Sequence, residues 1–538
     1  GLDPERVRLI APDVGGGFGG KGLSTEETII SWLARNTGQT VRWTETRSEN
    51  MVAMAHGRGQ AVEFQIGGDR EGHINALRVR LVQESGAYAW VGALLPALTA
   101  LMSSGVYRIP KIEVEFTSVL TNTSPTSAYR GAGRPEATQF LERAIDQFAS
   151  QLGLDPAETR RRNLIAADAF PFTTVTGAEY DCGDYGRALE LALETAGYDE
   201  LRSQQAARRA SGDRRLLGIG LSVYVEVTNG SSESEYGEVE ITAAGDAILK
   251  TGSFSHGQGH ETTFAQVVAQ HLGLPVERVT VIKGDTAQVA RGAGTYGSKS
   301  TQIGGVAARE AATEVVERGK ELAAEQLEAD PRDMELDFQA GRFHVAGAPE
   351  PALGWGELAA ALDAAGRLGE LTASVDFESA RPTFPFGAHV AVVEVDADTG
   401  AVTLERLIAV DDAGRIINPM IADGQIHGGV ASGIAQALHE QMAYDEDGNP
   451  LNANFVSYGI PAATEFPFFE LVRMETPTPV NPLGAKGIGE SGTIGSTPAV
   501  HNAVIDALAH LGVRHLDMPV NGERVWRAVA EAEQRGRG

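Results

Sequence analysis

VGGGFGGKG, residues 14–22, is the stretch from which the fold of this chain can be argued. An apolar run at 7–11 precedes it, and residues 25–33 follow with a helical pattern, where Ser24 and Glu27 are spaced as a capping box. We therefore predict a strand, a glycine loop and a helix, in that order. Such a loop at a helix N-terminus is typical of sites that bind phosphate.

Two nucleotide-binding patterns fit this loop in part. From Gly15 to Lys21 it matches the phosphate loop of nucleoside triphosphatases, but Gly22 stands where that loop needs a hydroxyl group to ligate magnesium. The triphosphate interpretation therefore fails. The same glycines match the dinucleotide fingerprint, and Glu45 lies at about the right distance to bind a ribose hydroxyl. A nicotinamide-dependent dehydrogenase stays open at this point.

Composition excludes several classes of protein. The 538 residues carry 45 basic and 72 acidic side chains, and the resulting formal charge of -27 disfavours binding to nucleic acid. No apolar stretch is long enough to span a membrane, and the cytoplasm is the expected compartment. The single cysteine, Cys182, excludes a disulfide within the chain and an iron–sulfur cluster held by this chain alone. The 64 glycines suggest backbone that passes close to something bulky.

Helix and strand patterns are mixed along the chain and favour an α+β fold in two halves. The polar segment 199–215 predicts a linker or an exposed helix between a first domain at 1–198 and a second at 216–538. Ser496 as N-cap and Pro498 in the first turn predict a helix that extends to residue 511. Strands are expected at 41–45, 61–66 and 77–81, hairpins at 239–250 and 390–410, and helices at 136–152, 261–272, 301–327 and 424–441.

Four further glycine-rich loops lie at 255–260, 292–301, 423–429 and 484–492. A nicotinamide dinucleotide normally needs one such loop, so five imply a larger polar ligand buried between the domains. Glu490 is the only carboxylate inside a glycine-flanked loop, and it is either a surface acid on a turn or a base beside the ligand. His256 and His260 have a spacing that suits zinc on a helix, but the glycines between them favour a loop.

Six different motifs follow one another along the chain. They are VGGGFGGK (14–21), AYRGAGR (128–134), SHGQGHET (255–262), GTYGSKST (294–301), Gly424-Gln425 and KGIGE (486–490). Together they resemble the molybdopterin-binding large subunit of the xanthine oxidase family, in order and in spacing. The similarity extends over nearly the whole chain, and the combination is specific although each motif alone is not.

This resemblance implies molybdenum held by the dithiolene of a pterin, usually the cytosine dinucleotide form in bacteria, with no direct protein ligand to the metal. Glu490 matches the family's catalytic base, which activates a water-derived oxygen for insertion into an aldehyde or an activated C–H bond. Gly131 and Ala132 match the substrate pocket. The positions that match cofactor-binding residues are Gly17, Phe18, Gly19, Arg130, Gly257, Gln258, Gly259, Thr295, Tyr296, Gly297, Ser298, Ser300, Thr301, Gln425, Lys486, Gly487 and Gly489.

The chain departs from two branches of that family at positions that matter for the substrate. The carbon monoxide dehydrogenases with copper carry a cysteine after the loop arginine, where this chain has Gly131, so the resemblance predicts neither copper nor authentic carbon monoxide oxidation. Purine hydroxylases carry a glutamate and an aromatic residue where this chain has Gly22 and Ala132. Aldehydes or other small carbonyl and heterocyclic substrates are favoured; a carbon monoxide dehydrogenase-like enzyme or a purine or N-heterocycle hydroxylase is the alternative.

The resemblance also implies partners. The family passes electrons to two iron–sulfur clusters and often a flavin, so we expect an iron–sulfur small subunit, an FAD medium subunit and a dimer of heterotrimers. The family has a further domain ahead of the first glycine loop, and we expect this chain to lack that segment. A non-catalytic chain that binds the pterin without turnover is the alternative from another class.

Overall fold

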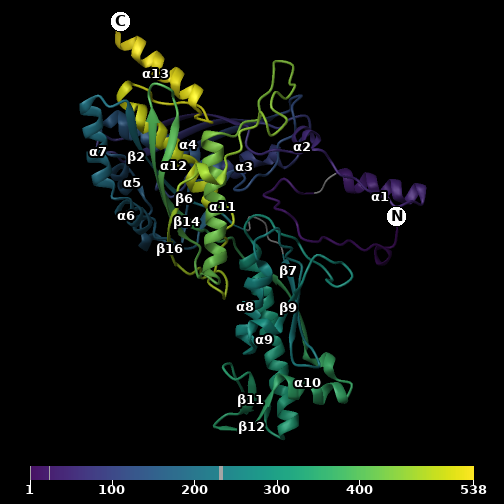
Figure 1. Cartoon of the computed structure of the whole chain (residues 1–538). Coiled ribbons are helices and arrows are strands. Elements are labelled where there is room, and N and C mark those ends of the chain that lie inside the picture. Colours follow the sequence, from purple (N-terminus) through teal and green to yellow (C-terminus); the bar gives the residue numbers. More distant parts are fainter. Residues whose placement is uncertain (1, 23–24, 229–233, 538) are drawn as a thin grey trace.

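The computed structural model describes residues 2–22, 25–228 and 234–537 (Figure 1). It is a mixed helix and sheet structure, as predicted. The largest body is built on a four-stranded sheet with the order β16-β15-β14-β6. β14 is antiparallel to both of its neighbours, and β15 and β16 run parallel. The strands are β6 (Arg215–Val225), β14 (Phe386–Asp396), β15 (Val402–Asp412) and β16 (Glu470–Met474).

Helices cover both faces of this sheet, which explains why β6 and β14 are almost continuously buried. The helices α6 and α7 pack on one side, and α12 packs across β6 and β14. Gly218 and Gly220 on β6 permit this contact, because a Cβ atom at either position would lie 2.0 Å from a backbone oxygen of α12. The helices are α6 (Tyr185–Ala196), α7 (Tyr198–Ser211), α11 (Pro419–Leu438), α12 (Ser491–Leu508) and α13 (Gly522–Arg537).

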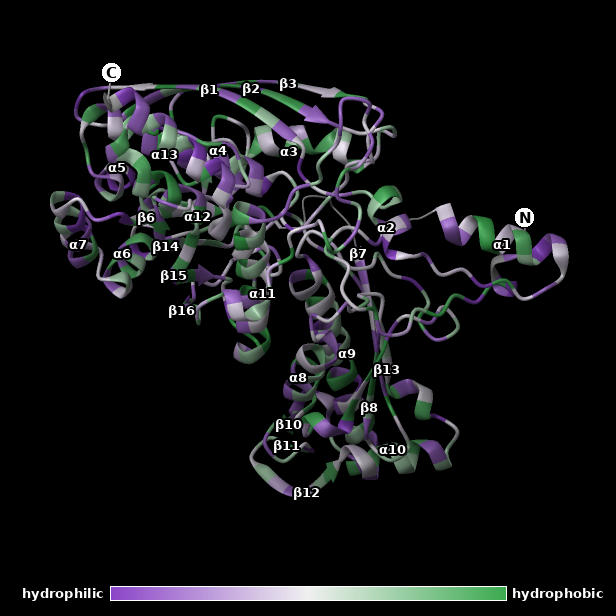
Figure 2. Cartoon of the chain, turned by 45° about the horizontal axis from the view of Figure 1, so that its top comes forward, coloured by the Kyte–Doolittle hydropathy of each residue, from purple (hydrophilic) through white to green (hydrophobic). Residues whose placement is uncertain are grey.

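The first third of the chain adds a three-stranded sheet with the order β1-β2-β3, which lies along one edge of the molecule above α3 and α4 (Figure 2). α4 packs against β1 and also against α12, so it joins the two sheets. The elements are α1 (Thr25–Thr37), α2 (Arg47–Ala53), β1 (Gln60–Gly68), β2 (Ile74–Glu84), α3 (Leu95–Leu101), β3 (Ile112–Val119), α4 (Arg134–Leu152), α5 (Pro156–Asn163), β4 (Phe172–Thr173) and β5 (Glu179–Tyr180).

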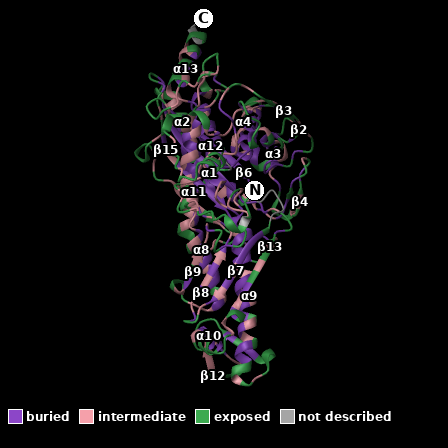
Figure 3. Cartoon of the chain, turned by 90° about the vertical axis from the view of Figure 1, so that its right-hand side faces the viewer, coloured by how far each residue is buried: buried purple, intermediate pink, exposed green. Residues whose placement is uncertain are grey.

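A second lobe extends away from this body and contains a four-stranded sheet with the order β13-β7-β8-β9 (Figure 1). α8 and α9 pack against each other and on this sheet, with buried residues between them (Figure 3). The elements are β7 (Ser234–Ile241), β8 (Ala247–Thr251), α8 (His260–Leu272), β9 (Val279–Ile282), α9 (Ser300–Leu327), β10 (Met334–Asp337), β11 (Arg342–Val345), β12 (Ala348–Gly354), α10 (Trp355–Ala364) and β13 (Thr372–Glu378).

Most of the predicted elements are present. Strands β1 and β2, both predicted hairpins, and helices α4, α8, α9 and α11 overlap the expected segments. Segment 199–215 contains helix α7, of which Leu201 and Gln205 are buried, and the domain boundary there stays a prediction. None of the helices in the described part of the chain has both the length and the apolar character needed to cross a membrane.

Three local predictions are wrong. Residues 41–45 form no strand, because no described segment pairs with them, and the run at 7–11 makes only one bridge, between Ile10 and Asp285. Helix α12 begins at Ser491 rather than after Ser496, so Pro498 lies inside it. Burial against α11, α4 and the central sheet stabilises the extra turns. The capping box expected at Ser24 lies outside the described residues.

Candidate active site

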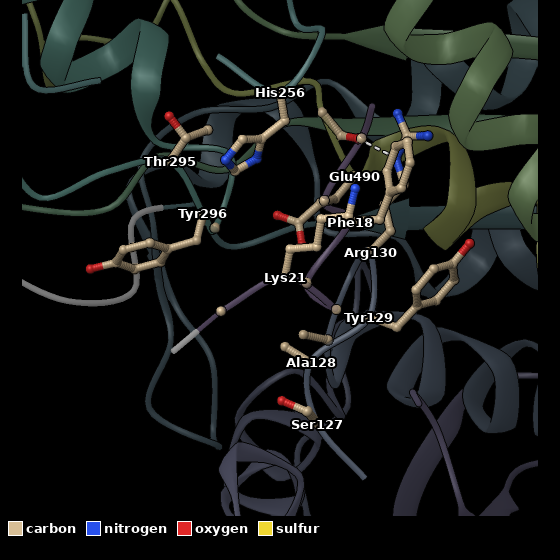
Figure 4. A pocket seen from close by; sticks show the side chains of 18 of the residues that line it. Phe18, Lys21, Ser127, Ala128, Tyr129, Arg130, His256, Thr295, Tyr296 and Glu490 are labelled. Carbon is tan, nitrogen blue, oxygen red and sulfur yellow. Dashed lines mark hydrogen bonds between the residues drawn. The ribbon is translucent and has the colours of Figure 1, made fainter. Parts of the chain in front are cut away.

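A cavity of about 2350 Å³ lies where the glycine-rich loops meet. Side chains from five separate segments surround it in Figure 4. The lining residues come from 11–22, 25–27, 122–134, 254–263, 295–301, 413–432 and 486–490, together with parts of 43–55, 87–98 and 444–450. Segments from both halves of the sequence therefore converge on one cavity, as the sequence analysis predicts. One of the five predicted loops is wrong, because residues 423–429 lie inside helix α11 (Pro419–Leu438).

Arg130 connects three of these segments through hydrogen bonds from its backbone and its side chain. Its backbone N–H donates to the Phe18 carbonyl at 2.8 Å, and its guanidinium lies 5.5 Å from the centre of the Phe18 ring. Nε donates to the Gly489 carbonyl at 2.6 Å and Nη2 to the Gln425 carbonyl at 2.9 Å. One buried cation thus fixes the relative position of the first glycine loop, helix α11 and the loop that carries Glu490.

Glu490 is the residue directly before helix α12, and its side chain is 15% exposed, toward the cavity. Oε1 accepts the Gly131 N–H at 2.8 Å, while Oε2 accepts the Ser298 hydroxyl at 2.6 Å and Arg134 Nη2 at 2.8 Å. Burial would raise the pKa of Glu490, but Arg134, Ser298 and Gly131 together hold that pKa below its usual value. Glu490 is therefore ionised at neutral pH, as a general base must be.

A second carboxyl group lies directly behind Glu490. Glu226 follows strand β6 and is fully buried, and it accepts the Ser491 hydroxyl at 2.8 Å. Arg134 Nη2 also reaches Glu226, at 3.4 Å. Burial and then the charge of Glu490 raise the pKa of Glu226 to about 8. The two glutamates therefore differ in charge at neutral pH, although both contact Arg134.

Comparison with known proteins shows the family. Residues 1–164 and 191–467 match two models that are both described as a molybdopterin cofactor-binding domain. The carbon monoxide dehydrogenase large chain of Hydrogenophaga pseudoflava is 38% identical over 99% of this chain and 68% of its own length. The nicotine 6-hydroxylase large subunit of Paenarthrobacter nicotinovorans is 35% identical over 98% of this chain and 67% of its own.

The fold agrees with these matches. A crystal structure of a copper- and molybdenum-containing carbon monoxide dehydrogenase aligns with a TM-score of 0.93, at 35% identity, over 99% of this chain and 69% of that one. Quinoline 2-oxidoreductase from Pseudomonas putida aligns with a TM-score of 0.92, at 36% identity, over 97% and 69%. The chain belongs to the xanthine oxidase family of molybdenum oxidoreductases. It is thus an enzyme chain of the molybdenum-dependent hydroxylase and dehydrogenase type.

The cavity of this xanthine oxidase family chain fits a bulky polar cofactor. Five glycines on its wall have no other atom within 4 Å of the place where a Cβ would stand, so their backbone faces open space inside the cavity. They are Gly15, Gly22, Gly257, Gly297 and Gly424. The absence of side chains at these positions leaves room for a bulky ligand such as a pterin and its phosphate to approach the backbone closely.

Nearly all the predicted site residues of this molybdenum hydroxylase line the cavity, and two do not. Gly131 lies behind the wall, where a Cβ would be 2.2 Å from Pro135 Cγ, and reaches the site only through its N–H. Gly259 is the N-cap of α8, and a Cβ there would lie 2.8 Å from Ile421 Cδ1. The cofactor and substrate roles of the predicted residues stay predictions.

Protein side chains form no direct metal site in the described ranges of this family member, where no cluster of three or more His, Cys, Asp or Glu residues could hold an ion. His256 and His260 both line the cavity. His260 stacks on Phe264 with ring centroids 5.2 Å apart, and burial lowers its pKa to about 4, so it is neutral at pH 7.

Sequence reasoning missed two charged groups of the hydroxylase site. Arg134 is the last residue of the motif AYRGAGR (128–134), which assigns it no function. In the structure it is the ion-pair partner of Glu490. No sequence motif includes Glu226. A signal for it exists, since this acid directly follows the segment Leu221–Val225, in which only Ser222 is not apolar, and a buried acid needs a partner.

Proposed function

We propose that this chain carries the substrate and molybdenum site of an enzyme that inserts a water-derived oxygen into a small aldehyde or another activated C–H bond, with Glu490 as the general base. The observation that supports this proposal is the ionised carboxylate of Glu490 on the wall of a cavity formed by the family's loops. When bound, the molybdenum cofactor supplies the oxygen transfer and the two-electron chemistry. Glu490 Oε1 or Oε2 takes the proton that the attacking oxygen must lose.

The same proposal assigns the glycine loops to the cofactor. Gly17, Phe18 and Gly19 approach the metal end, and Gln258 and Gln425 hold the pterin. The loop from Thr295 to Thr301, with Tyr296, Gly297, Ser298 and Ser300, and the loop with Lys486, Gly487 and Gly489 supply further amide and hydroxyl groups. All of these residues lie on the cavity wall. Open glycine backbone beside neutral side-chain donors supports a heterocyclic ligand with phosphate.

A small substrate is favoured by the wall next to Glu490. Ala132 on that wall has no aromatic ring, and Gly131 behind it has no thiol. Without a thiolate beside Arg130 we expect no copper and no authentic carbon monoxide oxidation, even though carbon monoxide dehydrogenases are among the relatives. N-heterocycles are the second candidate substrates, because relatives named for nicotine and quinoline share over a third of their aligned residues with this chain.

Partners and the form of the cofactor are further parts of the proposal. Relatives that are named as a large chain or a large subunit support the presence of partner subunits. We propose that these are an iron–sulfur subunit and an FAD subunit that accept the electrons, in a dimer of heterotrimers. We also propose the cytosine dinucleotide form of the pterin and a location in the cytoplasm. Co-expression with candidate partner subunits, followed by measurement of iron, flavin, molybdenum and nucleotide content, tests these points.

Glu490→Gln tests the proposed base in the purified holoenzyme. We expect kcat with aldehydes to fall by about 10² to 10⁴-fold, the usual contribution of general-base catalysis, while molybdenum and pterin content stay at the wild-type level. Glu440→Gln is the matched control, because burial also raises the pKa of Glu440, to about 7, but its side chain does not line the cavity. Undiminished turnover in Glu490→Gln would overturn the assignment.

A further inference from the structure

Glu226, Glu490 and Arg134 form a buried group with two carboxyls and one guanidinium. Arg134 Nη2 lies 2.8 Å from Glu490 Oε2 and 3.4 Å from Glu226 Oε1. The side chains of Glu226 and Arg134 are 0% and 6% exposed. The two carboxyls contact the same guanidinium nitrogen, and each shifts the pKa of the other. A hydrogen bond between two carboxyl groups requires a proton on one of them, because two carboxylates offer only acceptors.

The surroundings decide which carboxyl holds that proton. Glu490 has three donors, from Gly131, Ser298 and Arg134, each within 2.8 Å, and these stabilise its anion. Glu226 has the Ser491 hydroxyl at 2.8 Å and only a longer contact, of 3.4 Å, with the same Nη2 atom of Arg134. Since a buried charge is costly unless it is well paired, the proton resides on Glu226.

We propose that Glu226 is a positioning residue that stores the single proton of this carboxyl pair and thereby keeps Glu490 ionised and directed into the cavity. The inference rests on the proposed role of Glu490 as the base. It adds a resident hydrogen-bond donor behind that base. The bond from Glu226 to Glu490 stabilises the anion and prevents the carboxylate from turning away from the reacting oxygen.

Other charged and titratable groups near the pair come from four elements. Arg130 lies on the cavity side and interacts electrostatically with both glutamates. The Tyr224 hydroxyl on β6 donates to Asp411 on β15, and His389 Nε2 on β14 lies 3.0 Å from Asp411 Oδ1. Arg134 on α4 is the cation in direct contact with the two carboxyls. Burial raises the pKa of the Tyr224 hydroxyl well above its usual value, so the titration expected near pH 8 belongs to Glu226.

Infrared difference spectroscopy of the purified protein tests proton storage without any turnover. Between spectra recorded below and above pH 8, the wild-type protein should lose the carbonyl stretch of a protonated carboxyl group, and Glu226→Gln should lack this change. Glu440→Gln is the control, because it removes only the separate change expected near pH 7. A wild-type protein with no such band, or a band that persists in Glu226→Gln, would overturn the proposal.

The pH profile of kcat/KM in the holoenzyme tests the positioning role. Glu226→Gln keeps a neutral donor toward Glu490 and an acceptor for Ser491, so it should retain activity near neutral pH and lose the inflection near pH 8. Glu226→Leu removes the donor. It should lower kcat/KM by about ten- to a hundredfold, the usual effect of losing a hydrogen bond to a charged group, and move the acidic limb to higher pH.

The two variants distinguish positioning from mere structural support. Equal losses in Glu226→Gln and Glu226→Leu, or an unchanged acidic limb in Glu226→Leu, would contradict the proposal. Its failure also differs from failure of the proposed function. If Glu490→Gln stays active while the infrared band disappears in Glu226→Gln, the base is misassigned but the proton is stored as described.

Discussion

Gly131 contributes to the site through its backbone. Its φ of +100° places its N–H 2.8 Å from Glu490 Oε1, and a Cβ there would lie 2.2 Å from Pro135 Cγ. Gly131→Ala should therefore shift this turn and weaken the bond to Glu490. We expect kcat/KM to fall by about tenfold or more, because a hydrogen bond to a charged group is lost.

Gly177→Ala is the matched control for this prediction. Gly177 has a φ of +94°, but no atom lies within 4 Å of its Cβ position. Both variants should lower the thermal unfolding midpoint, since alanine is strained at such a φ, at a cost of about 1–3 kcal/mol. Only Gly131→Ala should change kcat/KM, and equal kinetics in the two would contradict the role given to the Gly131 amide.

Single residues also show the limits of reading a site from sequence. Glu490 could be found because glycines surround it in a motif, and its place on the cavity wall agrees with that reading. Glu226 and Arg134 could not be paired in the same way, because their contact depends on how β6 and α4 pack at the start of α12. Sequence patterns report local conformation, whereas ion pairs between distant elements appear only with the packing.

Helices α11 and α12 are held at close range by small residues. A Cβ on Gly433 of α11 would lie 2.0 Å from Ser496 Oγ and 3.0 Å from the backbone nitrogen of Thr497. Gly433→Ala should push the helices apart and destabilise the protein by about 1–3 kcal/mol, as overpacking does. Gly424→Ala on the same helix meets no atom within 4 Å, so an equal fall in its unfolding midpoint would refute this packing argument.

The same contact explains the wrong start predicted for α12. Ser496 and Pro498 have the local character of a helix beginning, but Ser491–Thr497 are fully enclosed by neighbouring elements. The Ser496 hydroxyl bonds to the Gly492 carbonyl inside the helix and does not cap its end. Tertiary burial overrides the local capping pattern. The helix therefore begins directly after Glu490, the proposed catalytic base.

Helices α4 and α5 are joined by a buried ion pair. Arg160 Nη2 lies 2.8 Å from Glu142 Oε2, and both side chains are fully buried. Arg160→Met should remove the cation from the buried Glu142, so we expect a loss of about 3–5 kcal/mol in unfolding free energy. Arg161→Met breaks an exposed pair with Glu190 and should cost at most about 1 kcal/mol. Similar losses in denaturant titrations of the two would contradict this account.

The stability of the whole molecule should depend on pH through its buried acids. In the folded chain the pKa values of Glu226 and Glu440 are raised to about 8 and about 7, mainly by burial, from a usual value of 4.5. The unfolded chain ionises these groups first as the pH rises, so unfolding releases protons. Their contribution to stability is therefore complete below pH 4.5 and is lost as the pH rises toward 8.

A double variant measures this effect. The unfolding midpoint of Glu226→Gln with Glu440→Gln should rise relative to wild type as the pH increases from about 4.5 to about 8, and then stay constant. A control in which exposed Glu335 and Glu378 are changed to Gln removes the same formal charge from the surface. If the control shows the same trend, net charge rather than burial causes the dependence.

At the scale of the molecule, the sequence predicted the α+β layers and the convergence of the loops, because both follow from local patterns and recurrent motifs. It did not predict how the lobe with α8 and α9 extends from the main body (Figure 1). That placement depends on contacts such as Asn418 Nδ2 with Gln266 Oε1 at 3.0 Å. The hydrophobic periodicity of these two segments does not indicate such a contact.

The three bonds of Arg130 have a consequence for biogenesis. Phe18 and Gly489 lie far apart in the sequence, yet Arg130 binds both. Its backbone N–H donates to Phe18, and its side chain donates to Gly489. The ribosome must therefore translate the chain past residue 489 before this part of the cavity can form. Whatever delivers the prosthetic group has to meet a chain that has folded at least that far, and a chain terminated before that residue could not receive it.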